Sequence, residues 1–312
     1  MSHVRGSKAM YGLSIVGLCL ALAPTANRAG GQTLFASTGG NGNVWAIATD
    51  GSKSLYATGL TQPSGLAIDA SGSLYVGDGT TGVITKIALG GARTTFGTGG
   101  GQITSMAFDS AGVLFAADYG GNIFKYATDG TKSTFVSGIA RPYGIAFDSA
   151  GNLYDHDVPG NIYKYTPGGV QSTFATGLLT GVSLAFDASG NLYSTEQGSA
   201  RVDKFTPGGV KSTFTSNVSN YPEGLAFDNS GNLFVADTPT GNIYSFTPAG
   251  TRSTFATGIT NAYYLAYTTR SLVPEPGAIA FVGIGTGVCG FWVLKFRRRR
   301  TVNYDRNQPV AN

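Results

Sequence analysis

The sequence predicts an all-β protein, a six-bladed β-propeller with four short strands in each blade. Three observations support this fold class. A segment related to Gly-Leu-Ala-Phe-Asp recurs every 39–41 residues, and each interval contains four strand-like runs. Glycine accounts for 47 of 312 residues, about twice its average usage, as turn-rich β proteins require. Four strands in about 40 residues are typical of one propeller blade.

The first strand of the repeat is its most regular part. Five clear copies occupy residues 65–69, 105–109, 144–148, 183–187 and 224–228. A degenerate sixth copy at 264–267 follows Asp228 by 39 residues. In the fifth unit the four strands are expected at 224–228, 232–237, 242–246 and 253–257. The links contain Asp-Asn-Ser-Gly and Thr-Pro-Ala-Gly, in which glycine supplies positive φ and Asp or Asn caps the turn.

The count of second strands predicts how the ring closes. Strands of the Leu-Tyr-Val-Ala-Asp type begin at six leucines: Leu34, Leu74, Leu114, Leu153, Leu192 and Leu233. The first of them has no Gly-Leu-Ala-Phe-Asp strand before it. The last strand of the Gly-Leu-Ala-Phe-Asp type, at 264–268, has no second, third or fourth strand after it. We therefore expect the N-terminus to give three outer strands, and the C-terminus the innermost strand, of one shared blade. This arrangement pairs edges that would otherwise stay open, and the propeller spans residues 30–270.

The N-terminal segment, residues 1–29, is predicted to be a secretory signal peptide. Arg5 and Lys8 precede an apolar run of 13 residues, 10–22, which is short for a membrane span. Small residues up to Ala26 leave the cleavage position open. An uncleaved anchor is the alternative interpretation.

The C-terminal segment has three parts in order: a Pro-Glu-Pro sequence, an apolar stretch at 277–294 and a basic cluster. The residues that define it are Pro274, Glu275, Pro276, Arg297, Arg298, Arg299 and Arg300. The apolar stretch predicts a short transmembrane helix, with the arginines on the cytoplasmic side. The order resembles the PEP-CTERM sorting signal of Gram-negative bacteria, which we assign to 271–300. Residues 301–312 are a short cytoplasmic tail that such signals usually lack.

This resemblance implies an exosortase as partner and transient attachment to the inner membrane. The protein would be secreted across that membrane and would then reach the cell surface or the extracellular matrix. A plain single-span anchor is the alternative interpretation of the same residues.

The distribution of charge argues against a nucleic-acid partner. The chain carries a formal charge of +4, but residues 24–273 contain 13 Lys and Arg against 15 Asp and Glu. The basic surplus therefore belongs to the two ends, and the predicted propeller has no basic footprint. Both cysteines, Cys19 and Cys289, also fall in the end segments. The predicted propeller therefore has no disulfide, catalytic thiolate or zinc–cysteine site.

The repeat Gly-Leu-Ala-Phe-Asp-x-x-Gly-Asn-Leu-Tyr-Val-Ala-Asp resembles NHL-repeat propellers and the regucalcin/gluconolactonase group, and more distantly streptogramin lyases. The resemblance covers about three quarters of the chain. It implies the propeller fold, but it implies no single activity, because such propellers include enzymes, sensors and binding proteins.

One face of the propeller is the expected ligand face. It should gather the acidic ends of the second strands: Asp78, Asp118, Asp157, Glu196 and Asp237. Loops between blades should add Arg141, Tyr143, Tyr221, Glu223 and Tyr263. Carboxylates with aromatic rings could hold a divalent cation, Ca²⁺ or Mg²⁺, or stack on a sugar. The alternative is that each acidic side chain caps its own loop.

The third unit departs from the repeat at Asp155 and His156, where the Leu-Tyr-Val-Ala-Asp motif has Val-Ala. Such departures are expected at functional sites, and the pair could bind a metal or share a proton. The alternative is sequence drift, or a buried Asp155 that pairs with a neighbouring Tyr or Lys. The resemblance to the regucalcin group places Glu223 at a metal-ligand position, with Asp157 and Asp237 as further candidates. The equivalents of Glu223 in other units are not carboxylates, which argues against a full metal site.

No nucleophile elbow, phosphate-binding loop or zinc-protease motif occurs in the sequence. The expected function is therefore that of a non-catalytic surface or matrix protein that binds an exopolysaccharide or a surface protein. The alternative is an extracytoplasmic metal-dependent hydrolase or lyase of the regucalcin/gluconolactonase or streptogramin-lyase type. A third hypothesis is a purely structural matrix component.

Overall fold

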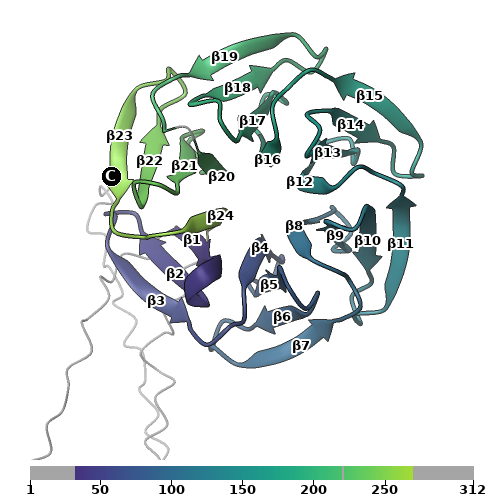
Figure 1. Ribbon diagram of the computed structural model, residues 1–312. Helices are drawn as coiled ribbons and strands as arrows, with labels where there is room; N and C mark the ends of the chain where they lie inside the picture. Colours follow the sequence, from purple (N-terminus) through teal and green to yellow (C-terminus); the bar gives the residue numbers. More distant parts are fainter. Residues whose placement is uncertain (1–31, 220, 270–312) are drawn as a thin grey trace, which may run out of the picture. The chain divides into compact units, whose positions relative to one another are not determined.

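Six antiparallel sheets of four strands each form a ring (Figure 1). The computed structural model describes residues 32–219 and 221–269, which all fall within one compact unit. The prediction of six four-stranded blades is confirmed. In the unit used above to predict strands, every predicted boundary lies within two residues of the observed one.

We number the blades from the N-terminus and give strands from the innermost outward. Blade 1 consists of β24 (Ala262–Thr268), β1 (Thr33–Thr38), β2 (Asn43–Ala48) and β3 (Lys53–Ala57), with a 3₁₀ turn η1 (Gly39–Asn41) after β1. Blade 2 consists of β4 (Pro63–Ile68), β5 (Leu74–Asp78), β6 (Ile84–Ile87) and β7 (Arg93–Gly97). Blade 3 consists of β8 (Ile103–Phe108), β9 (Leu114–Asp118), β10 (Asn122–Tyr126) and β11 (Lys132–Ser137).

The other three blades follow the same order. Blade 4 consists of β12 (Pro142–Phe147), β13 (Leu153–Asp157), β14 (Ile162–Tyr165) and β15 (Gln171–Ala175). Blade 5 consists of β16 (Gly181–Phe186), β17 (Leu192–Glu196), β18 (Val202–Phe205) and β19 (Lys211–Thr215). Blade 6 consists of β20 (Pro222–Phe227), β21 (Leu233–Asp237), β22 (Asn242–Phe246) and β23 (Arg252–Ala256).

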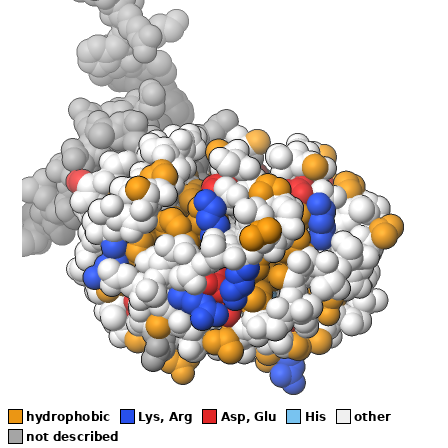
Figure 2. All heavy atoms as spheres, turned by 90° about the horizontal axis from the view of Figure 1, so that it is seen from above, with side chains coloured by type: hydrophobic (Ala, Val, Ile, Leu, Met, Phe, Trp, Pro, Cys, Tyr) orange, Lys and Arg blue, Asp and Glu red, His pale blue; other side chains and the backbone are white. Residues whose placement is uncertain are grey.

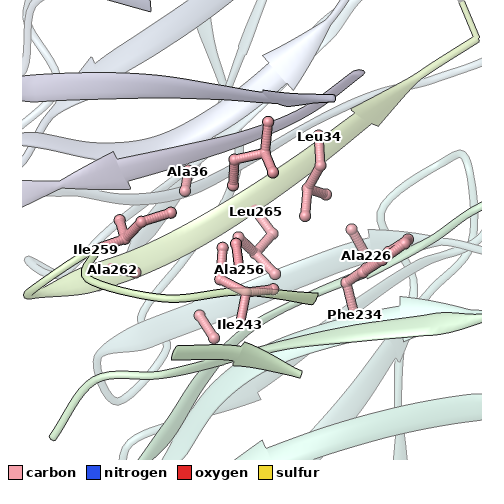
Figure 3. Packing of buried hydrophobic residues seen from close by; sticks show 11 residues of the cluster. Leu34, Ala36, Ala226, Phe234, Ile243, Ala256, Ile259, Ala262 and Leu265 are labelled. Atoms are coloured by element: carbon pink, nitrogen blue, oxygen red, sulfur yellow. The ribbon is translucent and has the colours of Figure 1, made fainter. Parts of the chain in front are cut away.

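The ring closes where the two ends of the propeller pair with each other. Strand β24 is antiparallel to β1, with Leu34 opposite Tyr267 and Ala36 opposite Leu265. Blade 1 therefore takes its innermost strand from the C-terminus, as the sequence predicts. Figure 3 shows the apolar seam that this closure forms with blade 6, where Leu34 and Leu265 lie near Phe234. Burial of these side chains holds the two ends of the domain together.

Every seam between blades has an apolar core, and the four seams from blade 2 to blade 6 repeat one aromatic contact. The second strand of one blade presents a Tyr or Phe whose ring meets an innermost-strand aromatic of the next blade. Tyr75–Phe108, Phe115–Phe147, Tyr154–Phe186 and Tyr193–Phe227 are all edge-to-face pairs with centroids 5.0 Å apart. Aromatic pairs of this geometry contribute about 0.5–1.5 kcal/mol beyond their buried area. The repeat thus specifies the packing between blades as well as the strands.

One position of the innermost strands alternates between glycine and a larger residue around the ring. Glycine is found at 65, 144 and 224, and the positions between them hold Ser105, Ser183 and Tyr264. The glycines allow close approach of neighbouring strands: a Cβ at Gly144 would lie 2.7 Å from the Val182 carbonyl oxygen. The serines make hydrogen bonds to the next blade: Ser183 Oγ accepts the backbone N–H of Leu225 at 3.1 Å.

We expect Gly144→Ala to lower the free energy of unfolding by about 1–3 kcal/mol, because the added methyl meets backbone that cannot rotate away. Urea unfolding of the variant and the wild type measures this difference. Gly90→Ala is the matched control, since a Cβ at Gly90 meets nothing within 4 Å. A Gly144→Ala protein as stable as the Gly90→Ala protein would contradict this account of the ring.

The surface of the propeller carries mixed charge. On the side shown in Figure 2, Lys and Arg side chains lie next to Asp and Glu rather than forming one basic patch. Within the part of the chain that the structure describes, no helix has the length and apolar character needed to cross a membrane. The predicted signal peptide, sorting signal and tail lie outside the described residues.

Candidate functional site

A cavity of about 620 Å³ opens at the channel mouth, on the face formed by the loops between second and third strands and between blades. We call it the cup. Its lining comes from five blades and the links between them: Gly39, Gln62, Pro63, Ser64, Gly79, Gln102, Ile103, Thr104, Tyr119, Tyr143, Val158, Thr180, Gln197, Tyr263 and Tyr264. Among these lining residues none is charged. The cup therefore offers amides, hydroxyls and aromatic rings to a ligand.

Two tyrosines from opposite blades form the floor of the cup. Tyr143 comes from β12 of blade 4 and Tyr264 from β24 of blade 1, and their rings stack with centroids 6.5 Å apart. Tyr264 stands where blades 3 and 5 have serine. Burial, and next the neighbouring Tyr143, raise the pKa of the Tyr264 hydroxyl. Burial and the Glu223 carboxyl raise the pKa of Tyr143 to about 12. Both hydroxyls are therefore neutral at physiological pH.

Glu223 lies directly behind the lining. It is 3% exposed, and its Oε1 accepts a long hydrogen bond, 3.4 Å, from Nε2 of Gln197, which lines the cup. Burial raises the pKa of Glu223 to about 8, and the Gln197 amide offsets this only in part. The carboxyl group is therefore mostly protonated at neutral pH.

The structure brings some of the predicted loop residues to the cup. Tyr143 and Tyr263 line it, and Glu223 supports Gln197. Arg141 lies at the rim with a positive φ of 62°, and its guanidinium is 5.5 Å from the centroid of Tyr119. Tyr221 is half exposed.

The acidic residues at the ends of second strands act as caps for loop backbone. They accept backbone N–H groups as follows: Asp78 from Thr80 at 2.8 Å, Asp118 from Gly120 at 3.2 Å, Asp157 from Asn161 at 2.6 Å, Glu196 from Leu179 at 2.8 Å and Asp237 from Ser219 at 2.9 Å. None of these five side chains lines the cup. Loop capping satisfies donors that would otherwise lack a partner.

Asp155 and His156 point into different seams of blade 4 and have no exposed surface. His156 lies against blade 5, with Nδ1 2.8 Å from Ser194 Oγ, and a Cβ on Gly181 would overlap its ring. Burial lowers the pKa of His156 to about 3, so the imidazole is neutral. Neither oxygen of Asp155 accepts a hydrogen bond of normal geometry, and the backbone of Tyr143 gives it only weak support. The structure thus separates the two residues that the sequence pairs.

The described residues contain no group of three or more His, Cys, Asp or Glu side chains arranged to hold a metal ion. The three predicted metal ligands lie apart in different environments. Asp157 caps a loop of blade 4, Asp237 caps a loop of blade 6, and Glu223 lies behind the cup. Nothing in this arrangement directs their oxygens to one point.

Five residues that line the cup were not predicted from the sequence: Gln62, Gln102, Gln197, Tyr119 and Tyr264. Gln62 and Gln102 share one position of the repeat, but the other units have different residues there, so the repeat does not mark the position as part of a site. Tyr264 does have a signal in the sequence, because it replaces the glycine or serine found at that position in every other unit.

No protein-family model matches the sequence, and no curated protein matches it. Solved structures do. A virginiamycin B lyase from Staphylococcus aureus is 17% identical, with a TM-score of 0.56 over 65% of this chain and 73% of that chain. A streptogramin B lyase structure is 16% identical, with a TM-score of 0.56 over 74% and 75%. At this level of identity the likeness shows the fold alone.

A third similar structure is a catalytically inactive His-to-Ala variant of the Staphylococcus aureus virginiamycin B lyase with quinupristin. It is 16% identical, with a TM-score of 0.56 over 75% of this chain and 78% of that chain. The structural neighbours of this propeller thus include streptogramin B lyases.

Proposed function

We propose that this protein binds a neutral, hydroxyl-rich ligand of the saccharide class in the cup. The observation that carries the proposal is the lining itself: it combines three glutamine amides, several hydroxyls and four tyrosine rings with no charged group. Amides and hydroxyls both donate and accept hydrogen bonds, as sugar hydroxyls do. Tyrosine rings offer flat apolar faces with a polar edge. A volume of about 620 Å³ suits a mono- or disaccharide.

The cellular setting that we propose follows from the two end segments. The signal peptide would direct secretion, and an exosortase would act at Pro274–Glu275–Pro276 after transient insertion in the inner membrane. At the cell surface or in the matrix the partner would be an exopolysaccharide or a glycosylated surface protein. A low-charge propeller with an uncharged cup is consistent with a neutral glycan.

The test is glycan binding by the full chain and by Tyr264→Ser. This variant should fold, because serine occupies the same ring position in blades 3 and 5. It removes half of the cup floor, so we expect binding of neutral oligosaccharides to weaken about 10-fold or more, equivalent to about 1.4 kcal/mol. Isothermal titration calorimetry measures the dissociation constants. Val210→Ser, at an exposed residue outside the cup, is the control. Equal affinities for wild type and Tyr264→Ser would contradict the proposal.

A lyase activity is the second candidate. The structural neighbours favour it, and so does Glu223, which can release a proton near neutral pH beside the cup. The neighbour that is catalytically inactive has lost a histidine. Here the single histidine of the described residues, His156, is buried between blades 4 and 5. Incubation with quinupristin, with and without Mg²⁺, followed by chromatography tests this candidate. Turnover that is lost in Glu223→Gln would favour the lyase over the binding protein.

A further inference from the structure

Three blades contain the same contact between a carboxylate, a tyrosine ring and a lysine. In blade 2, Lys86 Nζ lies 5.0 Å from the Tyr75 ring centroid and 3.3 Å from Asp69 Oδ2. Blades 4 and 5 repeat it with Lys164 at 5.4 Å from Tyr154 and 3.7 Å from Asp148, and with Lys204 at 5.1 Å from Tyr193 and 3.7 Å from Asp187. In each blade the lysine is the cross-strand partner of the tyrosine.

Blade 6 keeps the carboxylate and the ring of this contact but lacks the lysine. Phe234 stands at the tyrosine position, and its cross-strand partner is Ser245. A cavity of about 270 Å³ opens there, at the seam with blade 1, and Asp228, Phe234 and Ser245 all line it. The short serine side chain leaves unfilled the space that a lysine stem occupies in the other three blades.

The hydroxyl that Phe234 lacks is supplied from the next blade. Tyr267 of β24 lines the same cavity and stacks on Phe234, with centroids 6.3 Å apart and an angle of 18° between the rings. The seams of blades 2–5 have edge-to-face pairs at this point instead. Tyr267 and Asp228 both line this cavity, and burial, and next the Asp228 carboxylate, raise the pKa of Tyr267.

Blade 3 has the lysine and the carboxylate of this contact but no tyrosine hydroxyl. Its seam pairs Phe115 with Phe147, so neither ring carries a hydroxyl. Lys125 is the cross-strand partner of Phe115, yet it makes no ion pair with Asp109 in the described residues, and its Nζ lies 6.0 Å from the Phe135 ring instead. Among these four blades, the ion pair is present in the three that have a tyrosine beside the carboxylate and absent in the one that has a phenylalanine.

We propose that the cavity lined by Asp228, Phe234, Ser245 and Tyr267 is a binding site for a primary alkylammonium group, either a lysine side chain or a free amine. The ammonium group would lie between the Asp228 carboxylate and the aromatic rings, where blades 2, 4 and 5 place their own lysines. Its alkyl chain would lie along Leu34 and Phe255, which also line the cavity. An ammonium over an aromatic face beside a carboxylate combines a cation–π contact with an ion pair. This site is separate from the cup.

Saturation-transfer-difference NMR on the full chain tests the proposal with two probes, 1,5-diaminopentane and Nα-acetyl-lysine methylamide. We expect saturable binding of at least one probe, with a dissociation constant on the order of millimolar, as suits one exposed ion pair and one cation–π contact. Binding of both probes identifies a lysine-type ligand, and binding of the diamine alone identifies a free amine. 1-Pentanol, which lacks the ammonium group, should not compete.

Ser245→Lys should abolish the signal, because the variant fills the cavity with the lysine that the other blades carry. It should also raise the thermal midpoint by about 1–3 °C. Asp228→Asn, a second variant, should weaken binding about 10-fold, whereas Asp148→Asn, where Lys164 already occupies the equivalent space, should leave it unchanged. No saturable signal from either probe would overturn the proposal. So would binding that persists in Ser245→Lys and Asp228→Asn.

Discussion

Replacing Asp155 by valine is expected to raise the free energy of unfolding at pH 7 by on the order of 3 kcal/mol. Asp155 is fully buried in the seam with blade 3, where the backbone of Tyr143 offers only a poorly aligned hydrogen bond to its carboxyl group. Burial, and next the charge of Asp157, raise the pKa of Asp155 well above 3.8. Blades 2 and 6 have Val76 and Val235 at the equivalent position, so the seam accepts a valine there.

The gain should depend on pH with a defined sign. Between about pH 4 and the raised pKa, the unfolded chain releases the Asp155 proton while the folded chain keeps it, so the wild type loses stability as pH rises. The Asp155→Val protein has no carboxyl group at this position, so its stability does not fall with pH for this reason. Urea unfolding at pH 4, 5.5 and 7 should therefore show an advantage for the variant that is smallest at pH 4. The reciprocal change, Val76→Asp, should destabilise blade 2 at neutral pH. An Asp155→Val protein no more stable than wild type at pH 7 would refute this account.

Glu223→Gln should raise the thermal midpoint at pH 9 by about 6–12 °C, equivalent to a stabilisation on the order of 3 kcal/mol. Burial raises the pKa of Glu223 to about 8 from an ordinary value of 4.5. As pH rises from 4.5 to 8, the unfolded chain loses the proton before the folded chain does, and stability falls over that range. Glutamine reproduces the neutral form at every pH.

The groups that face Glu223 should not complicate this measurement. They are Tyr143 and Tyr264, whose pKa values are both raised, that of Tyr143 to about 12, so neither ionises below pH 9. The midpoints of wild type and variant should agree near pH 4.5 and diverge up to about pH 8. Asp129→Asn, an exposed change, serves as the control and should leave the wild-type profile unaltered. Parallel pH profiles for wild type and Glu223→Gln would show that the carboxyl group is not held neutral by the fold.

Much of the fold follows from local sequence. The repeat spacing predicts the number of blades, and the Asp-x-x-Gly turns predict where each first hairpin reverses. Asp69 illustrates why: its Oδ1 accepts the backbone N–H groups of Ser71 and Ser73, both at 2.9 Å, within the turn itself. The closure of blade 1 also follows from counting strands, because an unpaired edge at each end can be satisfied only by the other end.

The candidate site follows from sequence only in part. Tyr143, Tyr263 and Glu223 were predicted for the ligand face, and the structure places them at or behind the cup. Asp155 and His156 are neighbours in sequence, but successive side chains of a strand point to opposite faces. They therefore lie in separate seams, and their chemistry is set by different blades.

The sequence by itself determined the class of fold, the six blades and the four strands of each, because these depend on turns and alternation within about 40 residues. Only the tertiary structure decided which side chains share a site. The cup joins Gln62, Tyr143 and Tyr264, which lie up to about 200 residues apart, and it excludes the repeated carboxylates that cap their own loops. The protonation of Glu223 and Asp155 was likewise decided by burial, which depends on how neighbouring blades pack and not on any local pattern.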